Sequence, residues 1–411
     1  MLRPPDNYKI NKKNLTSVPP RVKLKASYNK RKDINTVILR NCTVLNDNFQ
    51  IERKDIRIVN GKISFGECSP FEDSIDLAGL TVIPGLIDIH IHGFMGVNVS
   101  IANTDDLKYM RRQLLLNGIT AFTPTTSTLP GDVLNNALKT IRASSEGSDD
   151  GAEIVGVNME GPFISKAKKG AMNEQYIRPF SESEFLEFTA SSGEMIKLMT
   201  LAPDVHENLR GIDILRKNGV VPSIGHTNAT ADEVDNAIRI GMLHTTHLFN
   251  AMRGMSHRDP GVVGSVFDSN ITAELICDGV HVNEKVIRIA YKILGRDRLI
   301  LISDAIPLAG MPDGEYEFDG QRTIIGNGIS KLPNGTINGN INSLFECVRR
   351  CVKQFGIPFE DAIYCASYAP AKRIGIQDRK GSISEGKDAD LIVIDGDFNI
   401  KQVYRSGIPS I

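Results

Sequence analysis

Eight short apolar runs, most of them separated by stretches with the periodicity of an amphipathic helix, constrain the fold of this chain more than any other feature. The runs cover residues 82–90, 119–125, 154–160, 196–202, 220–226, 242–247, 271–277 and 299–304. Helical candidates such as 104–118 and 230–241 lie between them, and Thr230 stands at the N-cap position of the second. Strands that alternate with helices in this number are typical of a parallel (β/α)8 barrel of the TIM type.

A doubly wound parallel sheet also alternates strands with helices, so the number of runs alone does not decide between the two folds. No glycine-rich phosphate-binding fingerprint follows the first run in the strand–turn–helix context that a dinucleotide site requires. This absence disfavours the doubly wound fold. We therefore predict an α/β chain with a TIM-type barrel over residues 82–375.

The two ends of the chain are predicted to build a second, smaller domain. Residues 36–81 hold short strand-like runs with no helix of useful length between them, which indicates a small antiparallel sheet. After a turn-rich, β-like insertion at 312–339 and two helical segments, residues 376–411 return to strand alternation. We predict that 36–81 and 376–411 pair with each other as a small β-sandwich domain.

The first 35 residues differ from the rest of the chain in charge. They contain ten Lys or Arg and two Asp, and so carry +8 against −9 for the remainder of a chain whose net charge is −1. Because this segment has no steady apolar period, we interpret residues 1–35 as a poorly ordered tail. Basic runs are unspecific, so a solvated extension is preferred to a nucleic-acid or membrane-surface partner.

Composition and cysteine usage predict the compartment. The chain has 41% hydrophobic and 24% charged residues, as soluble globular proteins do, and no apolar run long enough to span a bilayer. Its N-terminus lacks the apolar core of a secretory signal. Six cysteines without a Cys-x-x-Cys pair suit buried thiols in a reducing environment, so we expect a cytoplasmic protein.

Ligand-type side chains gather at the ends of the predicted strands, where barrel enzymes carry their chemistry. His90 and His92 close the first run two residues apart, which places them on one face of a strand. Later runs end in Glu160, His226, His247 and Asp304, and His281 follows the seventh. Five of the eight histidines fall at these ends, whereas chance would scatter them over surface loops too. His206 and His244 are interpreted as structural or surface residues.

Imidazole and carboxylate ligands suit zinc or ferrous iron with one coordination position open to water. Water bound to such a metal loses its proton near neutral pH, and the resulting hydroxide can attack an amide or ester carbonyl. Asp304 can accept that proton and later pass it to the leaving nitrogen. Each residue alone also fits a structural explanation, which for Asp304 is capping of the next helix. Only the cluster as a whole indicates a metal-dependent hydrolase.

Several motifs extend this interpretation, among them "GLIDIHIHG", "EGPFISKAKKGA", "SIGHTNA", "THLFNAM", "HRDPGVVG", "CDGVHV" and "ISDAIPLAGMPDG". With them, over roughly residues 38–405, the chain resembles the amidohydrolase superfamily and, more narrowly, the N-acetylglucosamine-6-phosphate deacetylases. The resemblance implies hydrolysis of the N-acetyl group of N-acetylglucosamine 6-phosphate to glucosamine 6-phosphate and acetate, in amino-sugar catabolism. Metal-bound hydroxide would be the nucleophile.

The resemblance also implies a role for each matching residue. Glu160, His226 and His247 match the family's metal site, and Asp304 matches its general acid/base. The positions that hold the sugar phosphate are matched by Asn250, Ala251, Arg258 and His281. In the family the arginine reaches into the neighbouring subunit's site, which implies a homodimer, and its planar guanidinium suits a phosphate.

The number of metal ions stays open at this point. Some family members have Gln and Asn where this chain has His90 and His92, and they work with one ion. Members with His-x-His can hold a second. The resemblance therefore allows one or two divalent ions here, with Glu160 as the bridge when both are bound.

Two departures from the family's pattern concern the substrate. Met172 stands where the family usually has a histidine that orients the substrate's acetyl carbonyl, and a thioether donates no hydrogen bond. Residues 337–343, "INGNINS", replace a stretch of small residues that lines the sugar site. Both changes bear on substrate identity more than on the type of reaction.

Two other functions compete with this one. A cyclic amidase of the dihydroorotase or hydantoinase kind would commonly use a carbamylated lysine as the bridging ligand, whereas Glu160 ends the third run here. A catalytically silent barrel that serves as a scaffold typically loses its ligands, whereas this chain keeps them all. We therefore expect an enzyme that acts on a phosphorylated amino sugar.

Overall fold

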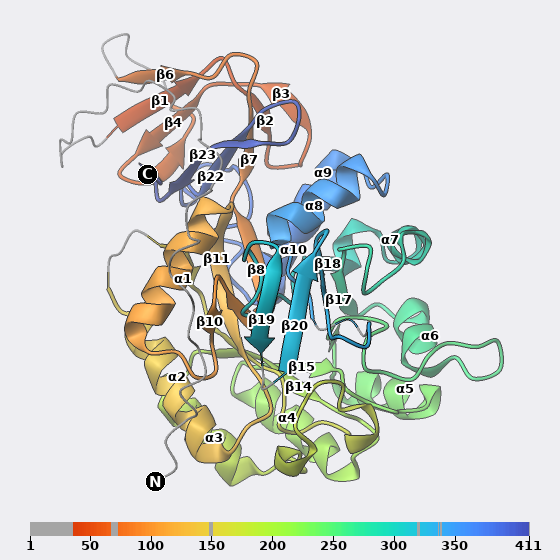
Figure 1. Cartoon of the computed structure of the whole chain (residues 1–411). Helices are drawn as coiled ribbons and strands as arrows, with labels where there is room; N and C mark the ends of the chain where they lie inside the picture. The colour runs from red at the N-terminus through yellow and green to blue at the C-terminus, as the bar shows by residue number, and fades with distance from the viewer. Residues whose placement is uncertain are drawn as a thin grey trace.

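A computed structural model describes residues 36–66, 73–147, 151–318, 321–335, 337 and 339–410. Within them a parallel barrel carries two small sheets at one end (Figure 1). The predicted tail, residues 1–35, lies outside the described residues, so its disorder stays a prediction.

The barrel contains eight parallel strands that pair in chain order, and a two-residue strand, β12 (Glu153–Ile154), also pairs with its second strand. The eight are β8 (Leu86–Ile91), β11 (Ile119–Thr126), β13 (Val157–Met159), β14 (Ile196–Leu201), β15 (Val221–Ile224), β16 (His244–Thr245), β17 (Thr272–Ile276) and β18 (Leu299–Ile302). A parallel bridge between Ile91 and Ala305 brings the last strand back to the first. Every residue of β8, β11 and β18 is buried, as expected for a parallel wall covered on both faces. The predicted barrel is confirmed.

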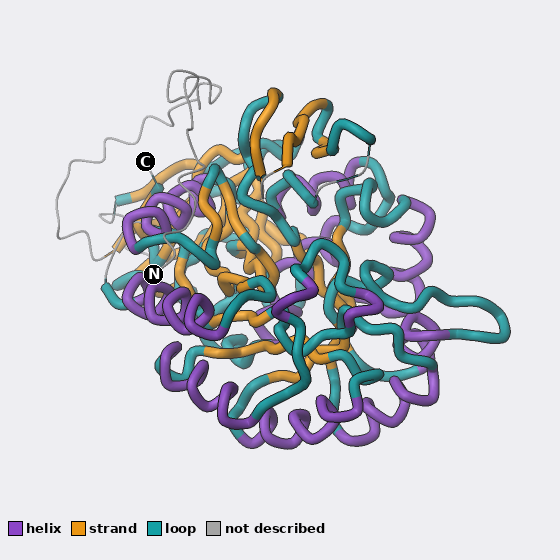
Figure 2. Tube along the Cα trace, turned by 60° about the horizontal axis from the view of Figure 1, so that its bottom comes forward, coloured by secondary structure: helices purple, strands orange, loops and turns teal. Residues whose placement is uncertain are grey.

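Helices lie around the outside of these strands (Figure 2). They are α1 (Thr104–Leu116), α2 (Gly131–Ser145), α3 (Glu182–Ser192), α4 (Leu209–Lys217), α5 (Ala231–Ile240), α6 (Gly261–Asp268), α7 (Glu284–Arg298), α8 (Leu344–Lys353), α9 (Phe359–Ala366) and α10 (Tyr368–Arg373). The predicted cap of α5 is confirmed: the Thr230 hydroxyl accepts a hydrogen bond from the Glu233 N–H, and the Glu233 carboxylate accepts one from the Thr230 N–H. No helix in these described ranges is both long and apolar enough to cross a bilayer.

The two ends of the chain share a pair of small sheets. One has the order β24-β23-β22-β7-β2-β3, and the other has the order β5-β4-β1-β6. Their strands are β1 (Thr36–Arg40), β2 (Thr43–Leu45), β3 (Ile51–Arg53), β4 (Ile56–Val59), β5 (Lys62–Ser64), β6 (Ser74–Asp76), β7 (Thr81–Pro84), β22 (Leu391–Ile394), β23 (Ile400–Arg405) and β24 (Ile408–Pro409). Because β7 pairs with β22, the predicted pairing between the chain ends is confirmed.

Two details of the prediction are wrong. The N-terminal strands do not form a purely antiparallel sheet, because β1 pairs parallel with β6 and β2 pairs parallel with β7. The run 82–90 is not one barrel strand either: β7 belongs to a small sheet and β8 to the barrel. The chain changes sheets at Gly85, where a β-carbon would lie 2.1 Å from the Thr120 hydroxyl oxygen, so only glycine fits this close approach.

The β-like insertion after β18 is a three-stranded antiparallel sheet rather than a hairpin. It contains β19 (Gly314–Phe318), β20 (Gln321–Gly326) and β21 (Ile329–Lys331). Leu308 and Ile325 form a small core beneath it. Tyr316 of β19 and Ile325 of β20 thus attach the insertion to Leu308 in the loop that follows β18.

A buried ion cluster joins the barrel to the small sheets. The Lys380 side chain is 1% exposed, and its Nζ lies 2.9 Å from Glu153 of β12. The same nitrogen lies 3.0 Å from Asp388 and 2.5 Å from Asp390, just before β22. One ammonium group thus neutralises carboxylates from both parts of the molecule, since an unpaired buried charge would be costly.

Candidate metal centre

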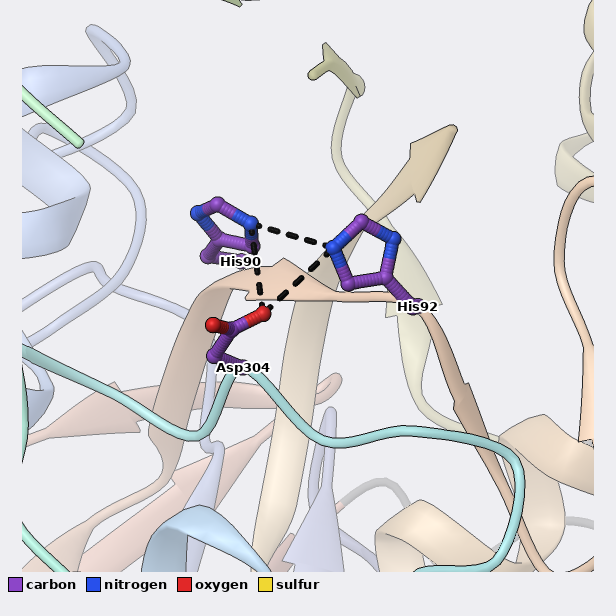
Figure 3. A group of neighbouring side chains, drawn as sticks. All are labelled: His90, His92 and Asp304. Atoms are coloured by element: carbon purple, nitrogen blue, oxygen red, sulfur yellow. Dashed lines mark hydrogen bonds and ion pairs between the residues drawn. The ribbon is translucent and has the colours of Figure 1, made fainter. Parts of the chain in front are cut away.

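The carboxyl ends of the barrel strands bring six predicted residues into two groups of potential ligands. One group is His90, His92 and Asp304, and the other is Glu160, His226 and His247. Within each group the ligand atoms lie within 4.8 Å of one another. Figure 3 shows the first group, in which two rings and a carboxylate point toward one another from the end of β8, from the residue after it and from the loop after β18.

Glu160 touches both groups. Its Oε1 lies 2.9 Å from His226 Nε2 and 2.6 Å from His247 Nε2. Its Oε2 lies 2.9 Å from His92 Nε2. The carboxylate is nearly fully buried, so both of its oxygens contact imidazole nitrogens instead of water. This is the position that a bridging ligand between two ions would take.

All four histidines direct Nε2 toward this carboxylate and direct Nδ1 away from it. His90 Nδ1 lies 2.8 Å from Glu274, and His226 Nδ1 lies 3.0 Å from the Lys168 carbonyl. His92 Nδ1 lies 3.4 Å from the Ser127 hydroxyl, and the buried Nδ1 of His247 has no hydrogen-bond partner among the described residues. An outward Nδ1 hydrogen bond and an inward Nε2 lone pair are typical of metal-binding histidines. The donor set therefore fits a divalent metal.

The charges of the cluster support the same conclusion. Burial favours the neutral form of Glu160, but His226 and His90 outweigh it and hold the pKa of the carboxyl well below its usual value. Burial likewise opposes the charged form of His92, but Asp304 and Glu160 raise its pKa to about 9. In the protein alone, the anions thus favour the protonated forms of His90, His92 and His247, whose pKa values are raised. A divalent cation would supply that positive charge and displace those protons.

Asp304 is ionised in these surroundings. Burial would raise the pKa of its carboxyl, but His90 and His92 hold it below the ordinary value. Its Oδ1 lies 3.5 Å from His90 Nε2 and 3.4 Å from His92 Nε2. A charged carboxylate here can accept a proton from a reacting group at the centre.

The backbone turns sharply at three residues of the candidate site. His226, His247 and Asp304 have φ angles of 46°, 26° and 49°, in the left-handed region that side chains other than glycine rarely adopt. Each of the three residues follows a barrel strand, so the chain leaves the direction of the strand at that residue. Strained residues of this kind persist where the surroundings demand one side-chain direction, and they cluster at functional sites.

The predicted sugar-phosphate residues lie in three places. Asn250 and Ala251 are the third and fourth residues after His247, and the Asn250 side-chain amide lies 3.4 Å from the His247 carbonyl oxygen. His281 Nδ1 lies 2.6 Å from Asp278, in the loop after β17. Burial opposes the charge on His281, but Asp278 raises its pKa, which favours an imidazolium for an anionic group. Arg258 is exposed on the loop between β16 and α6, which projects from the body of the molecule (Figure 1).

Sequence reasoning missed one buried acid, Glu274 of β17. Its carboxylate is 1% exposed and lies 2.8 Å from His90 Nδ1 and 3.2 Å from His244 Nε2. His244, interpreted above as structural, is buried and also lies 2.7 Å from the Thr272 hydroxyl. A glutamate inside the otherwise apolar run "ITAELIC" was the available signal, because a charge in a buried strand needs a partner.

Comparison of the sequence with those of known proteins shows its family. The sequence pattern of the amidohydrolase family matches residues 81–408. An N-acetylglucosamine-6-phosphate deacetylase of Lysinibacillus sphaericus is 34% identical over 376 residues, which cover 90% of this chain and 97% of the relative. The chain belongs to the N-acetylglucosamine-6-phosphate deacetylase family.

Solved structures of this family agree with the fold. The N-acetylglucosamine-6-phosphate deacetylase of Pasteurella multocida is 31% identical and has a TM-score of 0.85, with 91% of this chain and 99% of that one covered. A mutant of the Mycobacterium smegmatis enzyme, in complex with N-acetyl-D-glucosamine-6-phosphate, is 28% identical and has a TM-score of 0.83, with 92% and 99% covered.

The first departure from the family's pattern lies next to the centre. Met172 is partly buried, and its sulfur accepts a hydrogen bond of 3.4 Å from the Thr128 N–H. The same segment covers His226, because a β-carbon on Gly170 would lie 3.2 Å from the His226 ring. Met172 therefore belongs to the wall of the site, and its sulfur supplies an acceptor and no donor.

The second departure lies behind Asp304. Asn340 is 2% exposed, and its side-chain amide donates a hydrogen bond of 2.6 Å to the carbonyl of Ser303, the residue before Asp304. Its Oδ1 accepts a hydrogen bond of 2.9 Å from the Asn342 side chain. These two asparagines thus support the loop that carries Asp304.

Proposed function

We propose that this protein hydrolyses the N-acetyl group of N-acetylglucosamine 6-phosphate and releases acetate and glucosamine 6-phosphate. The observation that carries the proposal is the buried cluster of four imidazoles around Glu160, with the Asp304 carboxylate beside it. The relatives that bear the name of this activity extend over nine-tenths of the chain.

We assign the ligands as follows. Glu160, His226 and His247 would hold one ion, and His90 and His92 would hold a second with Glu160 between the two. The donor set permits zinc or iron. When bound, a divalent metal lowers the pKa of a coordinated water and polarises the amide carbonyl.

The remaining steps belong to side chains of this chain. Asp304 accepts the proton of the attacking water and returns it to the amide nitrogen as the bond to the acetyl carbon breaks. Asn250, Ala251 and His281 hold the sugar phosphate, and the charge on His281 favours the anion. We also propose a cytoplasmic location, because the five described cysteines are free and buried, as in a reducing compartment.

An acetate-release assay tests this function. Purified protein is given the phosphorylated and the unphosphorylated amino sugar, before and after treatment with a chelator. We expect turnover of the phosphorylated sugar, loss of that turnover with the chelator, and recovery with added zinc or ferrous iron. A metal-loaded protein that releases acetate from neither sugar would refute the proposal.

Arg258 is proposed to bind the phosphate of the substrate in a neighbouring subunit, so the active form is a homodimer. Replacing Arg258 by alanine should raise KM for the phosphorylated sugar about 10- to 100-fold, because a charge-assisted hydrogen bond to phosphate contributes about 1.5–3 kcal/mol. Turnover of the unphosphorylated sugar should not change.

The projecting loop offers a matched control for this experiment. His257 is the exposed neighbour of Arg258, and His257→Ala should leave KM as it is. Sedimentation of the native protein tests the dimer directly. A monomer with full activity would contradict the role given to Arg258.

A further inference from the structure

Glu274 contacts the imidazole ring of His90 in one ligand group, but only the backbone N–H of His247 in the other. Its Oε2 is 2.8 Å from His90 Nδ1, on the side of the ring opposite to Glu160 and Asp304. The corresponding nitrogen of His226 is held instead by the Lys168 carbonyl oxygen. A change at Glu274 thus reaches the His90–His92–Asp304 group directly and leaves the support of His226 intact.

The Glu274 carboxylate is itself held in place. His244 Nε2 lies 3.2 Å from its Oε1, and the other nitrogen of His244 lies 2.7 Å from the Thr272 hydroxyl. The His247 N–H also donates a hydrogen bond of 3.2 Å to Oε2. Because Glu274, His244 and His90 are all buried, these contacts fix the orientation of the carboxylate and of the His90 ring.

We propose that Glu274, oriented by His244, is a positioning residue that enables the His90–His92–Asp304 group to hold the second ion. Its Oε2 accepts a hydrogen bond from the Nδ1–H of His90, which leaves the Nε2 lone pair free toward the centre. A buried carboxylate at Nδ1 of His90 also makes Nε2 a stronger metal ligand. This inference rests on the proposed metal-dependent function and adds a residue that sets the number of ions.

The test counts ions. Wild-type protein and Glu274→Gln are loaded with zinc, dialysed against graded chelator and analysed for metal per chain; cobalt-loaded samples are compared by visible absorption. We expect two ions in the wild type. In the variant the second ion should bind about 10- to 100-fold more weakly, as typical for a lost carboxylate behind a metal-binding histidine, while the first ion keeps its affinity.

Three further variants make the result specific. His90→Gln removes the ligand itself and should give the same one-ion protein as Glu274→Gln. Glu284→Gln makes the same chemical change at the exposed start of α7 and should keep both ions. Glu274→Asp keeps the charge and should recover part of the second-ion affinity. If Glu274→Gln does not fold, His244→Gln tests the same proposal, because it releases the carboxylate without touching His90.

Two outcomes would overturn the inference: second-ion affinity in Glu274→Gln equal to that of the wild type, or equal weakening of both ions. A wild type that takes up only one ion would also overturn it. The metal analysis and the acetate-release assay test different proposals and can fail independently. Loss of the second ion in Glu274→Gln would stand even if the wild type released no acetate, and in that case only the proposed substrate would be wrong.

Discussion

Asp304→Asn should lower the turnover of the phosphorylated amino sugar by about 10²- to 10⁴-fold, the range expected when a positioned proton-transfer group is removed. An amide has nearly the same shape as the carboxylate but cannot accept the proton. The Glu160–His226–His247 group does not include Asp304, so the variant should retain at least that ion. Steady-state kinetics and metal analysis on one preparation give both quantities.

A matched control for this substitution is available in the insertion after β18. Asp313 is exposed there, and Asp313→Asn makes the same chemical change outside the centre. Its turnover should equal that of the wild type. If Asp304→Asn retained metal and kept full turnover, Asp304 would not be the proton-transfer group, and another base would have to be sought.

Lys380→Met should lower the free energy of unfolding by about 3–5 kcal/mol, because removal of one partner from a buried ion cluster leaves unpaired charge inside the protein. Asp390 would then lose the cation that lies 2.5 Å from it, whereas Arg379 would stay paired with Glu153 and 2.7 Å from Asp388. Methionine keeps most of the apolar volume of the lysine side chain. The loss in the free energy of unfolding would therefore reflect the missing charge rather than a cavity. Denaturant unfolding at neutral pH measures it.

Lys62 offers a control with the same partner. Its Nζ lies 2.5 Å from Asp388, but its side chain is 48% exposed. Lys62→Met should therefore cost less than about 1 kcal/mol, as exposed ion pairs do. Equal losses for the two variants would show that burial does not set the strength of this cluster.

The pH dependence of the cluster follows from its pKa shifts. Burial lowers the pKa of Lys380, but Asp390 and Glu153 raise it above the ordinary value, so its stabilisation is lost only as the pH rises through the folded pKa in strong alkali. Burial raises the pKa of Glu153 and Asp388, but their cationic partners lower it below 4.5 and 3.8. The stabilisation from these carboxyls is lost as the pH falls below those values. The difference between wild type and Lys380→Met should therefore shrink in acid.

Much of the fold followed from local patterns in the sequence. The alternation of apolar runs with helical segments predicted the barrel, and the cap at Thr230 was placed correctly because a capping box is complete within four residues. The positions of the candidate ligands were predictable for a related reason. All parallel strands of a barrel end on the same side, so residues far apart in sequence, such as His90 and Asp304, are brought together by their place at strand ends alone.

Other features depended on contacts that no local pattern contains. The change of sheets at Gly85 reflects the approach of Thr120. The parallel pairs within the small sheets depend on which strand ends up beside which. The hydrogen bond from Asn340 to the Ser303 carbonyl, next to Asp304, could be known only from the fold of the loop after β18.

By itself the sequence determined the barrel, the strand ends that carry the ligands and the class of chemistry, because each of these is encoded by periodicity or by position within one element. The tertiary structure decided that Glu160 lies between two ligand groups, that Glu274 supports His90 across 184 residues of chain, and that Lys380 joins both parts of the molecule. Buried charges acquire partners only when the chain closes around them, and closure depends on all the elements at once.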